Sequence, residues 1–215
     1  MFDRELDHLP AEVRWREWMN RVEATIFAAS EPVTRETLAR IVGKNCGIDL
    51  LIDDIREELR GRPYDLVAVA GGWKHLTRPA YADAIRAAVG ASERTIDLTQ
   101  SEVLTLMTIA YFQPITRAEL SSFFGKEISR DLIGNLRGFG LIASGPRSPT
   151  PGAPYTYVTT KAFLLEFGLD TLRDLPDFEA LEDAGLLSKD KLLAGEIMPG
   201  FSVGGDDAAD VVLDE

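Results

Sequence analysis

The residue types that most often carry catalysis are sparse in this chain of 215 residues. Its two histidines are His8 and His75, and its single cysteine is Cys46. A zinc site of usual spacing needs more ligands of these types than the chain supplies. Neither histidine stands in a context that indicates an activated base. We therefore predict a protein that is not an enzyme and that uses no metal and no cofactor.

The other candidate motifs have a structural interpretation as well as a chemical one. The pairs Gly43-Lys44 and Gly125-Lys126 end predicted helices, so they read as helix C-caps and not as a phosphate-binding loop. The acidic pairs at 53–54 and 57–58 favour a solvated helix face over a carboxylate site. Cys46 lies in a turn, which favours an inert loop residue over a reactive thiol, and its isolation fits a reducing cytosol.

Composition limits the location and the partners. No stretch of about 18 apolar residues is present and no signal peptide is recognisable, so we expect a cytoplasmic protein without a membrane span. The net charge is −12, and residues 177–215 hold eleven acidic side chains against two lysines. We expect this segment to be an acidic, largely flexible tail. The rest of the chain is close to neutral and lacks the broad basic surface of a non-specific DNA binder.

One internal repeat organises the chain. Residues 22–77 return 82 positions later, so that the segment 31–35 (Glu-Pro-Val-Thr-Arg) returns as 113–117 (Gln-Pro-Ile-Thr-Arg). A plan that is written twice is most simply two copies of one small domain. For the first copy we expect helices over 18–29, 34–43 and 51–61, strands over 66–69 and 73–76 joined through Gly71-Gly72, and a last helix that opens at Pro79.

The second copy repeats these elements with clearer helix starts. Thr99 with Glu102, and Thr116 with Glu119, both fit the capping box. Ser129 starts the third helix, for which we expect Leu132, Ile133 and Leu136 in the core. A loop over 144–154 then separates two strands. Three helices followed by a hairpin predict a mainly helical α+β protein with two tandem winged-helix domains.

A winged helix often binds DNA through its third helix, so a DNA-binding transcriptional regulator is the main alternative function. In the first copy this helix is acidic, with Arg56 and Arg60 against Asp49, Asp53, Asp54, Glu57 and Glu58. Such a surface repels phosphates. In the second copy the balance of charges around the third helix only weakly permits binding to phosphates. We therefore expect weak nucleic-acid binding at most, and a protein partner instead.

Four segments, in order, resemble one known family. They are residues 23–32, residues 106–119 (Leu-Met-Thr-Ile-Ala-Tyr-Phe-Gln-Pro-Ile-Thr-Arg-Ala-Glu), residues 157–169 and residues 172–176. Together they are similar to segregation and condensation protein B, the tandem winged-helix accessory subunit of the bacterial condensin. The chain departs from the family pattern at 123–127 and in its second wing at 144–154. A divergent paralogue with its own kleisin is therefore an alternative within the family.

The resemblance implies a homodimer that is paired through a first domain at 15–95. It also implies that a second domain, at 96–176, binds the central segment of a kleisin, segregation and condensation protein A. Through this kleisin the chain would join the structural-maintenance-of-chromosomes (SMC) ATPase and act in chromosome condensation and segregation.

Two groups of residues are candidates for these contacts. Trp15, Trp18 and Phe27 look surplus to a small core, and we expect them at the dimer interface. For the kleisin we expect a surface around Tyr111, Phe112, Gln113 and Arg117, where the resemblance is densest. The alternative for Phe112 is a side chain folded into the core at the junction between two helices.

Overall fold

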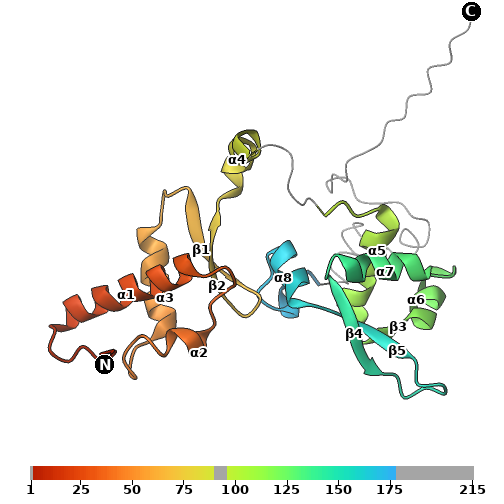
Figure 1. The fold of residues 1–215 in the computed structure, drawn as a ribbon, viewed down its shortest axis with the longest axis horizontal. Coiled ribbons are helices and arrows are strands. Elements are labelled where there is room, and N and C mark those ends of the chain that lie inside the picture. The colour runs from red at the N-terminus through yellow and green to blue at the C-terminus, as the bar shows by residue number, and fades with distance from the viewer. Residues whose placement is uncertain (1, 90–95, 178–215) are drawn as a thin grey trace, which may run out of the picture. The chain divides into compact units, whose positions relative to one another are not determined.

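The computed structural model describes residues 2–89 and 96–177 (Figure 1). It divides into two compact units, unit 1 with residues 1–93 and 164–174, and unit 2 with residues 94–163 and 175–215. Both units mix α and β structure, with about half of the described residues in helices and with small sheets. The predicted acidic tail lies, from residue 178 onward, outside the described residues.

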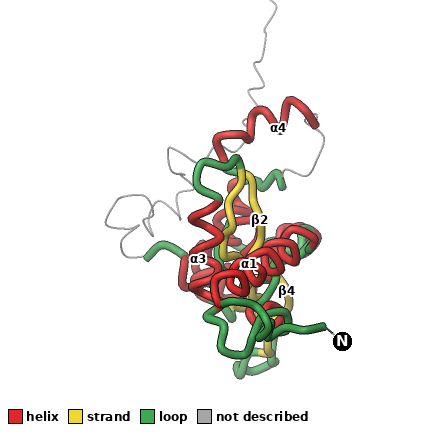
Figure 2. The backbone as a smooth tube through the Cα atoms, turned by 90° about the vertical axis from the view of Figure 1, so that its left-hand side faces the viewer, coloured by secondary structure: helices red, strands yellow, loops and turns green. Residues whose placement is uncertain are grey.

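Unit 1 has helices on both sides of a hairpin. Its elements are α1 (Ala11–Ala28), α2 (Arg35–Leu38), α3 (Ile48–Glu58), β1 (Tyr64–Val69), β2 (Gly72–Thr77), a 3-10 turn at Pro79–Tyr81 and α4 (Ala82–Val89). Helix α1 packs against both α3 and β2 (Figures 1 and 2). Helix α4 extends away from these elements in both views, and Tyr81 and Ile85 are exposed.

The core of unit 1 lies between α1, α3 and β1. The spacing of the apolar residues places one face of each helix inside. The buried side chains include Trp18, Met19, Val22 and Ile26 of α1, Leu51, Ile52 and Ile55 of α3, and Leu66 of β1. Trp18 is only 9% exposed, and its indole nitrogen donates to the Arg4 carbonyl at 2.8 Å. Trp18 therefore belongs to the core, whereas the sequence suggested a surplus aromatic residue.

The hairpin of unit 1 turns one residue earlier than predicted. Ala70 and Gly71 form the turn, and Gly72 already pairs with Val69 as the first residue of β2. Val33 lies against the β2 edge, and it exchanges backbone hydrogen bonds of 2.9 and 3.0 Å with Trp73. A Cβ atom on Gly72 would stand 2.8 Å from the Val33 carbonyl oxygen. Gly72 is thus needed for this close backbone approach, and not for the turn itself.

The two predicted glycine C-caps differ in the structure. Gly125 has φ 62° and ends its helix in the left-handed conformation, as predicted. Gly43 does not cap a helix, because α2 already ends at Leu38. The chain then forms tight turns, in which Arg40 and Ile41 donate to carbonyls three residues earlier. A Cβ atom on Gly43 would lie 2.5 Å from the Trp18 ring. Glycine is therefore needed at position 43 because the Trp18 indole packs directly against its backbone.

A segment from late in the chain completes the hairpin of unit 1. The backbone N–H of Ala70 donates to the Leu169 carbonyl at 2.9 Å. The N–H of Gly71 donates to the Asp170 carbonyl at 3.1 Å and to its carboxylate at 2.9 Å. These bonds satisfy two donors of the turn, in which Ala70 is buried and Gly71 is exposed, and they explain why residues 164–174 belong to unit 1.

Unit 2 repeats the order of elements. It contains α5 (Gln100–Phe112), β3 (Ile115–Thr116), α6 (Arg117–Phe124), α7 (Arg130–Gly138), β4 (Ile142–Arg147), β5 (Tyr155–Thr159) and the start of α8 (Lys161–Phe167), whose end, with the 3-10 turn at Leu172–Asp174, lies in unit 1. The strands form an antiparallel sheet in the order β3-β5-β4. Both predicted capping boxes, Thr99 with Glu102 and Thr116 with Glu119, are confirmed.

Two details of unit 2 differ from the prediction. Leu132 is only half-buried, whereas Ile133 and Leu136 are in the core as expected. The predicted loop from residue 144 begins later, because β4 runs to Arg147 across an irregularity that follows Ser144. A loop rich in glycine and proline thus begins as an irregular strand.

We predict that Gly72→Ala lowers the melting temperature of unit 1. The added Cβ atom would force Val33 away from β2, and overpacking of this kind costs about 1–3 kcal/mol. All three tryptophans lie in unit 1, so tryptophan fluorescence during heating reports this unit, while far-ultraviolet circular dichroism reports the helices of both units. The control is Gly134→Ala in α7, where the Cβ atom meets open space. It should not lower the melting temperature, since alanine is preferred over glycine in a helix by about 1 kcal/mol. A Gly72→Ala protein that melts like the wild type contradicts this account.

Candidate functional site

A groove opens beside the junction of α5 and α6 in unit 2. We call it the aromatic groove. It has a volume of about 620 Å³ and is lined by Phe112, Pro114, Ile115, Glu119, Ser122, Phe123 and Gly125. Most of these side chains are apolar, so the groove suits an apolar group of a partner better than a charged one.

Phe112 stands at the rim of the aromatic groove. It is the last residue of α5, its side chain is 45% exposed, and its ring centroid lies 5.5 Å from that of Phe123 on α6. The Phe123 ring in turn lies 5.3 Å from Phe124, which is buried. The three rings lead from the surface to the core. Phe112 is therefore at the surface of unit 2 and not folded into its core.

Gln113 holds the junction together from the inside. Its amide nitrogen donates to the Thr159 hydroxyl at 2.9 Å and to the Ala110 carbonyl at 3.1 Å. Its amide oxygen accepts from the Thr159 backbone N–H at 2.8 Å. The side chain thus ties the end of α5 to the end of β5. This role was not visible in the sequence, because the partner lies 46 positions away.

Tyr111 and Arg117 also make contacts within unit 2. The Tyr111 hydroxyl donates to the Pro176 carbonyl at 2.8 Å, and burial together with the charge of Asp177 raises its pKa. The Arg117 guanidinium donates to the Ile128 carbonyl at 3.3 Å and lies 3.6 Å from the Glu127 carboxylate. Of the four candidate residues, Phe112 is the one that lines the aromatic groove.

The three candidate aromatic residues of unit 1 have separate surroundings. Trp15 is half-buried, and its indole nitrogen donates to the Asp54 carboxylate at 2.7 Å. Trp18 is in the core, and its ring meets that of Trp15 edge-on. Phe27 is 80% exposed at the end of α1. Only Phe27 presents a large apolar surface to solvent.

An aromatic cluster that the sequence did not indicate surrounds His75. The imidazole ring lies 6.3 Å from Phe27 and 5.7 Å from Tyr64, with both rings roughly perpendicular to it. The three side chains come from α1, β1 and β2, so they meet only in the folded unit. Phe27 is the exposed end of this cluster.

Cys46 is the one thiol of the chain, and it is half-buried. Burial raises the pKa of the Cys46 thiol to about 11, so the thiol stays protonated near neutral pH, in agreement with an inert loop residue. Residues 2–89 and 96–177 contain no group of three His, Cys, Asp or Glu side chains that could hold a metal ion. In the same residues no helix has both the length and the apolar character that crossing a membrane requires.

The charges on α3 are largely compensated within unit 1. Arg56 lies 3.8 Å from Asp53, Arg60 lies 2.7 Å from Glu57, and Arg35 pairs with Asp49. These arginines are engaged with neighbouring carboxylates. Helix α3 therefore presents no cationic surface to a phosphate backbone.

The fold is that of a mixed α+β protein with two small helix-rich units. Residues 20–178 match the family described as "Segregation and condensation complex subunit ScpB". The segregation and condensation protein B of Desulforamulus reducens is 37% identical over 162 residues, which cover 74% of this chain and 87% of that protein. The homologue from Coxiella burnetii is 31% identical over 167 residues, which cover 75% and 79%. The crystal structure of ScpB from Mycobacterium tuberculosis is 28% identical, with 72% and 97% covered and a TM-score of 0.33.

The chain therefore belongs to the ScpB family. Membership assigns it to chromosome segregation and condensation, as a subunit of the segregation and condensation complex. The resemblance seen in four ordered segments of the sequence is confirmed.

We predict that Gln113 acts through folding. Gln113→Leu keeps the size of the side chain but leaves the Thr159 N–H without its partner, which costs about 1–3 kcal/mol. The free energy of unfolding should fall by that amount in a urea titration. The double variant Gln113→Leu with Thr159→Val should lose less unfolding free energy than the sum of the losses in the two single variants, because the two residues share one set of hydrogen bonds. Full additivity would show that the two side chains do not act together.

Proposed function

We propose that this chain is a non-enzymatic, cytoplasmic accessory subunit of an SMC–kleisin condensin, which binds the central segment of the kleisin. The observation that carries the proposal is the family match over residues 20–178. The sparse catalytic residue types are consistent with a binding role.

We interpret each unit as a winged helix. In unit 1 three helices precede the β1–β2 hairpin, and in unit 2 three helices precede the β4–β5 hairpin. The third helix of a winged helix is the usual DNA-reading element. In unit 1 this helix is α3, in which Arg56 pairs with Asp53, and Arg60 just beyond the helix pairs with Glu57. This pairing favours a protein partner over a DNA-binding regulator.

We place the kleisin contact on unit 2, at the aromatic groove. Apolar pockets with exposed aromatic rims supply most of the binding energy in many protein interfaces. Phe112 has that position, with Phe123 behind it. Gln113, Tyr111 and Arg117 would act by holding the groove in shape, since each of them is bonded to neighbouring parts of unit 2.

Phe112→Ala should weaken kleisin binding with little loss of stability. The ring is 45% exposed, so its removal should cost much less than the 3–5 kcal/mol of a buried phenyl ring. Binding of the central kleisin segment from the same genome can be measured by calorimetry, with a melting curve recorded for each variant. We expect a loss of affinity of at least about tenfold, as for other interface anchors.

Two phenylalanines of unit 2 provide matched controls. Phe139 is 42% exposed and does not line the aromatic groove, so Phe139→Ala should bind the kleisin normally. Phe124 is buried, so Phe124→Ala should lower the melting temperature. If Phe112→Ala binds as the wild type does, the kleisin contact lies elsewhere.

We also propose that the protein is a homodimer paired through its first domain. Phe27 is the best-placed aromatic residue, because it is 80% exposed and continues an aromatic cluster with His75 and Tyr64. Exposed aromatic side chains of this kind are enriched at interfaces.

Phe27→Ser should shift the dimer toward the monomer, because it removes an apolar ring from the proposed contact. Equilibrium sedimentation of the full chain at micromolar concentration measures this shift. Leu50→Ser is the control, since Leu50 is also an exposed apolar residue of unit 1, at 66%. A wild-type protein that sediments as a monomer would contradict the homodimer. A dimer that both variants keep would contradict the role of Phe27.

A further inference from the structure

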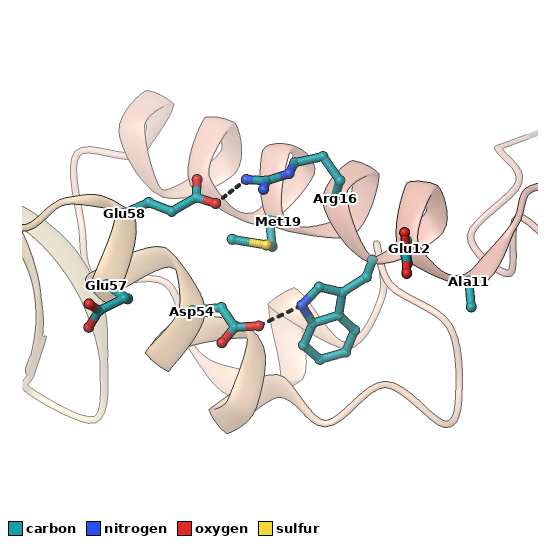
Figure 3. A pocket seen from close by; sticks show the side chains of 8 residues that line it. Ala11, Glu12, Arg16, Met19, Asp54, Glu57 and Glu58 are labelled. Atoms are coloured by element: carbon teal, nitrogen blue, oxygen red, sulfur yellow. Dashed lines mark hydrogen bonds and ion pairs between the residues drawn. The ribbon is translucent and has the colours of Figure 1, made fainter.

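A second groove runs between α1 and α3 of unit 1 (Figure 3). We call it the acidic groove. It has a volume of about 560 Å³ and is lined by Ala11, Glu12, Trp15, Arg16, Met19, Asp54, Glu57 and Glu58. It lies on a different unit from the aromatic groove, and the proposed function makes no use of it.

The floor of the acidic groove is apolar and fixed. Met19 is 4% exposed and belongs to the core, and Trp15 packs against the same core. In Figure 3, Met19 lies between the Arg16–Glu58 pair and Asp54. Because Met19 is almost completely buried, the half-buried indole of Trp15, packed on this core, supplies the preformed apolar surface of the groove.

A hydrogen bond fixes one wall. The Trp15 indole nitrogen donates to the Asp54 carboxylate at 2.7 Å. The indole is a neutral donor, so it orients the carboxylate without cancelling its charge. An aromatic ring and an anion are thus held side by side at the edge of the groove.

The charge of the lining is not balanced. Four carboxylates face one guanidinium, that of Arg16, which pairs with Glu58. Glu57 pairs with Arg60, which follows the end of α3. Among the described residues, neither Glu12 nor Asp54 is within ion-pair distance of a cationic side chain. Elsewhere on α3, Asp49 and Asp53 do have arginine partners, so the uncompensated acids gather at the groove.

The lining of the acidic groove favours a peptide segment with cationic side chains over a single metal ion. No three carboxylates of the described residues are placed to hold a metal. Lysine and arginine side chains instead combine a long apolar stem with a charged end. The stem matches the exposed part of the Trp15 ring, and the charged end matches Asp54 and Glu12, with an attraction of the cation to the indole ring in addition.

We infer that the acidic groove binds a basic segment of a protein partner, in which lysine or arginine side chains alternate with apolar ones. One cationic side chain lies along the Trp15 ring, above the buried Met19, and places its charge between Asp54 and Glu12. Nucleic acid is repelled by the same carboxylates. The inference does not depend on kleisin binding at the aromatic groove.

The test uses the full chain and a dodecapeptide that repeats lysine–alanine–lysine–leucine, in about 150 mM salt so that distant charges are screened. The indole N–H groups of Trp15, Trp18 and Trp73 give separate signals in a proton–nitrogen NMR spectrum, and Trp15→Phe assigns the first. We expect the Trp15 signal to move on titration while the Trp18 signal, from an indole in the core, stays. A peptide with glutamate in place of lysine should move neither.

Affinity measurements on charge variants complete the test. Asp54→Asn with Glu12→Gln removes two charges but keeps an acceptor oxygen for the Trp15 indole, so the fold is preserved. Binding of the lysine peptide should weaken at least about tenfold, as expected when charged partners are removed. The control, Glu31→Gln with Asp131→Asn, removes two charges outside the groove and should retain nearly all binding.

Four results would overturn the inference. The groove variant could bind the lysine peptide as tightly as the wild type. The control variant could lose as much affinity as the groove variant, which would mean that net charge alone attracts the peptide. The Trp15 signal could stay while the others move. The groove variant could change the sedimentation of the protein without peptide, which would make the groove a contact between copies of this chain.

Discussion

The side chain of Gln113 is the interaction on which the surface of unit 2 depends. By bonding Thr159 on one side and Ala110 on the other, it fixes where α5 ends relative to β5. The chain then runs directly through β3 into α6, whose first turn is closed by the Thr116 capping box. With both ends of the junction fixed, the rings carried on α5 and α6 pack against each other in the lining of the aromatic groove. A polar network at this point therefore creates an apolar surface.

The same plan supports two different surfaces in the two units. By the spacing of the internal repeat, Phe112 and Phe123 correspond to Ser30 and Ile41 in the first copy, so the pair of rings is not repeated. Conversely, the acidic groove depends on Trp15 and Asp54, and Trp15 lies before the start of the repeat. The two copies share the order of their elements, while several caps and the exposed faces differ. The two grooves are accordingly suited to chemically different partners.

Local signals in the sequence predicted most of the helices and strands. Contacts between residues that are distant in the sequence could not be predicted in this way. The capping boxes and the Gly125 cap were predictable because the residues that make them are neighbours in the chain. The shifted hairpin turn was not, since it depends on Val33 lying against Gly72. Trp18 looked surplus because its contact with Gly43 cannot be read from spacing. At the site, Phe112 was identified from the family resemblance, but the groove behind it required Phe123, and the acidic groove required two helices to be placed side by side.

The hydrogen bonds from Ala70 and Gly71 to residues 169 and 170 have a consequence for how the protein is made. A ribosome releases the chain from its N-terminus, so the hairpin emerges long before the segment that satisfies its turn. Until residue 170 has left the exit tunnel, unit 1 can form its helices and strands but not its complete set of backbone bonds. Contacts between positions so far apart in sequence are formed late, because a long loop must close first. A nascent or prematurely terminated chain thus exposes an unfinished first unit to the quality-control machinery of the cell.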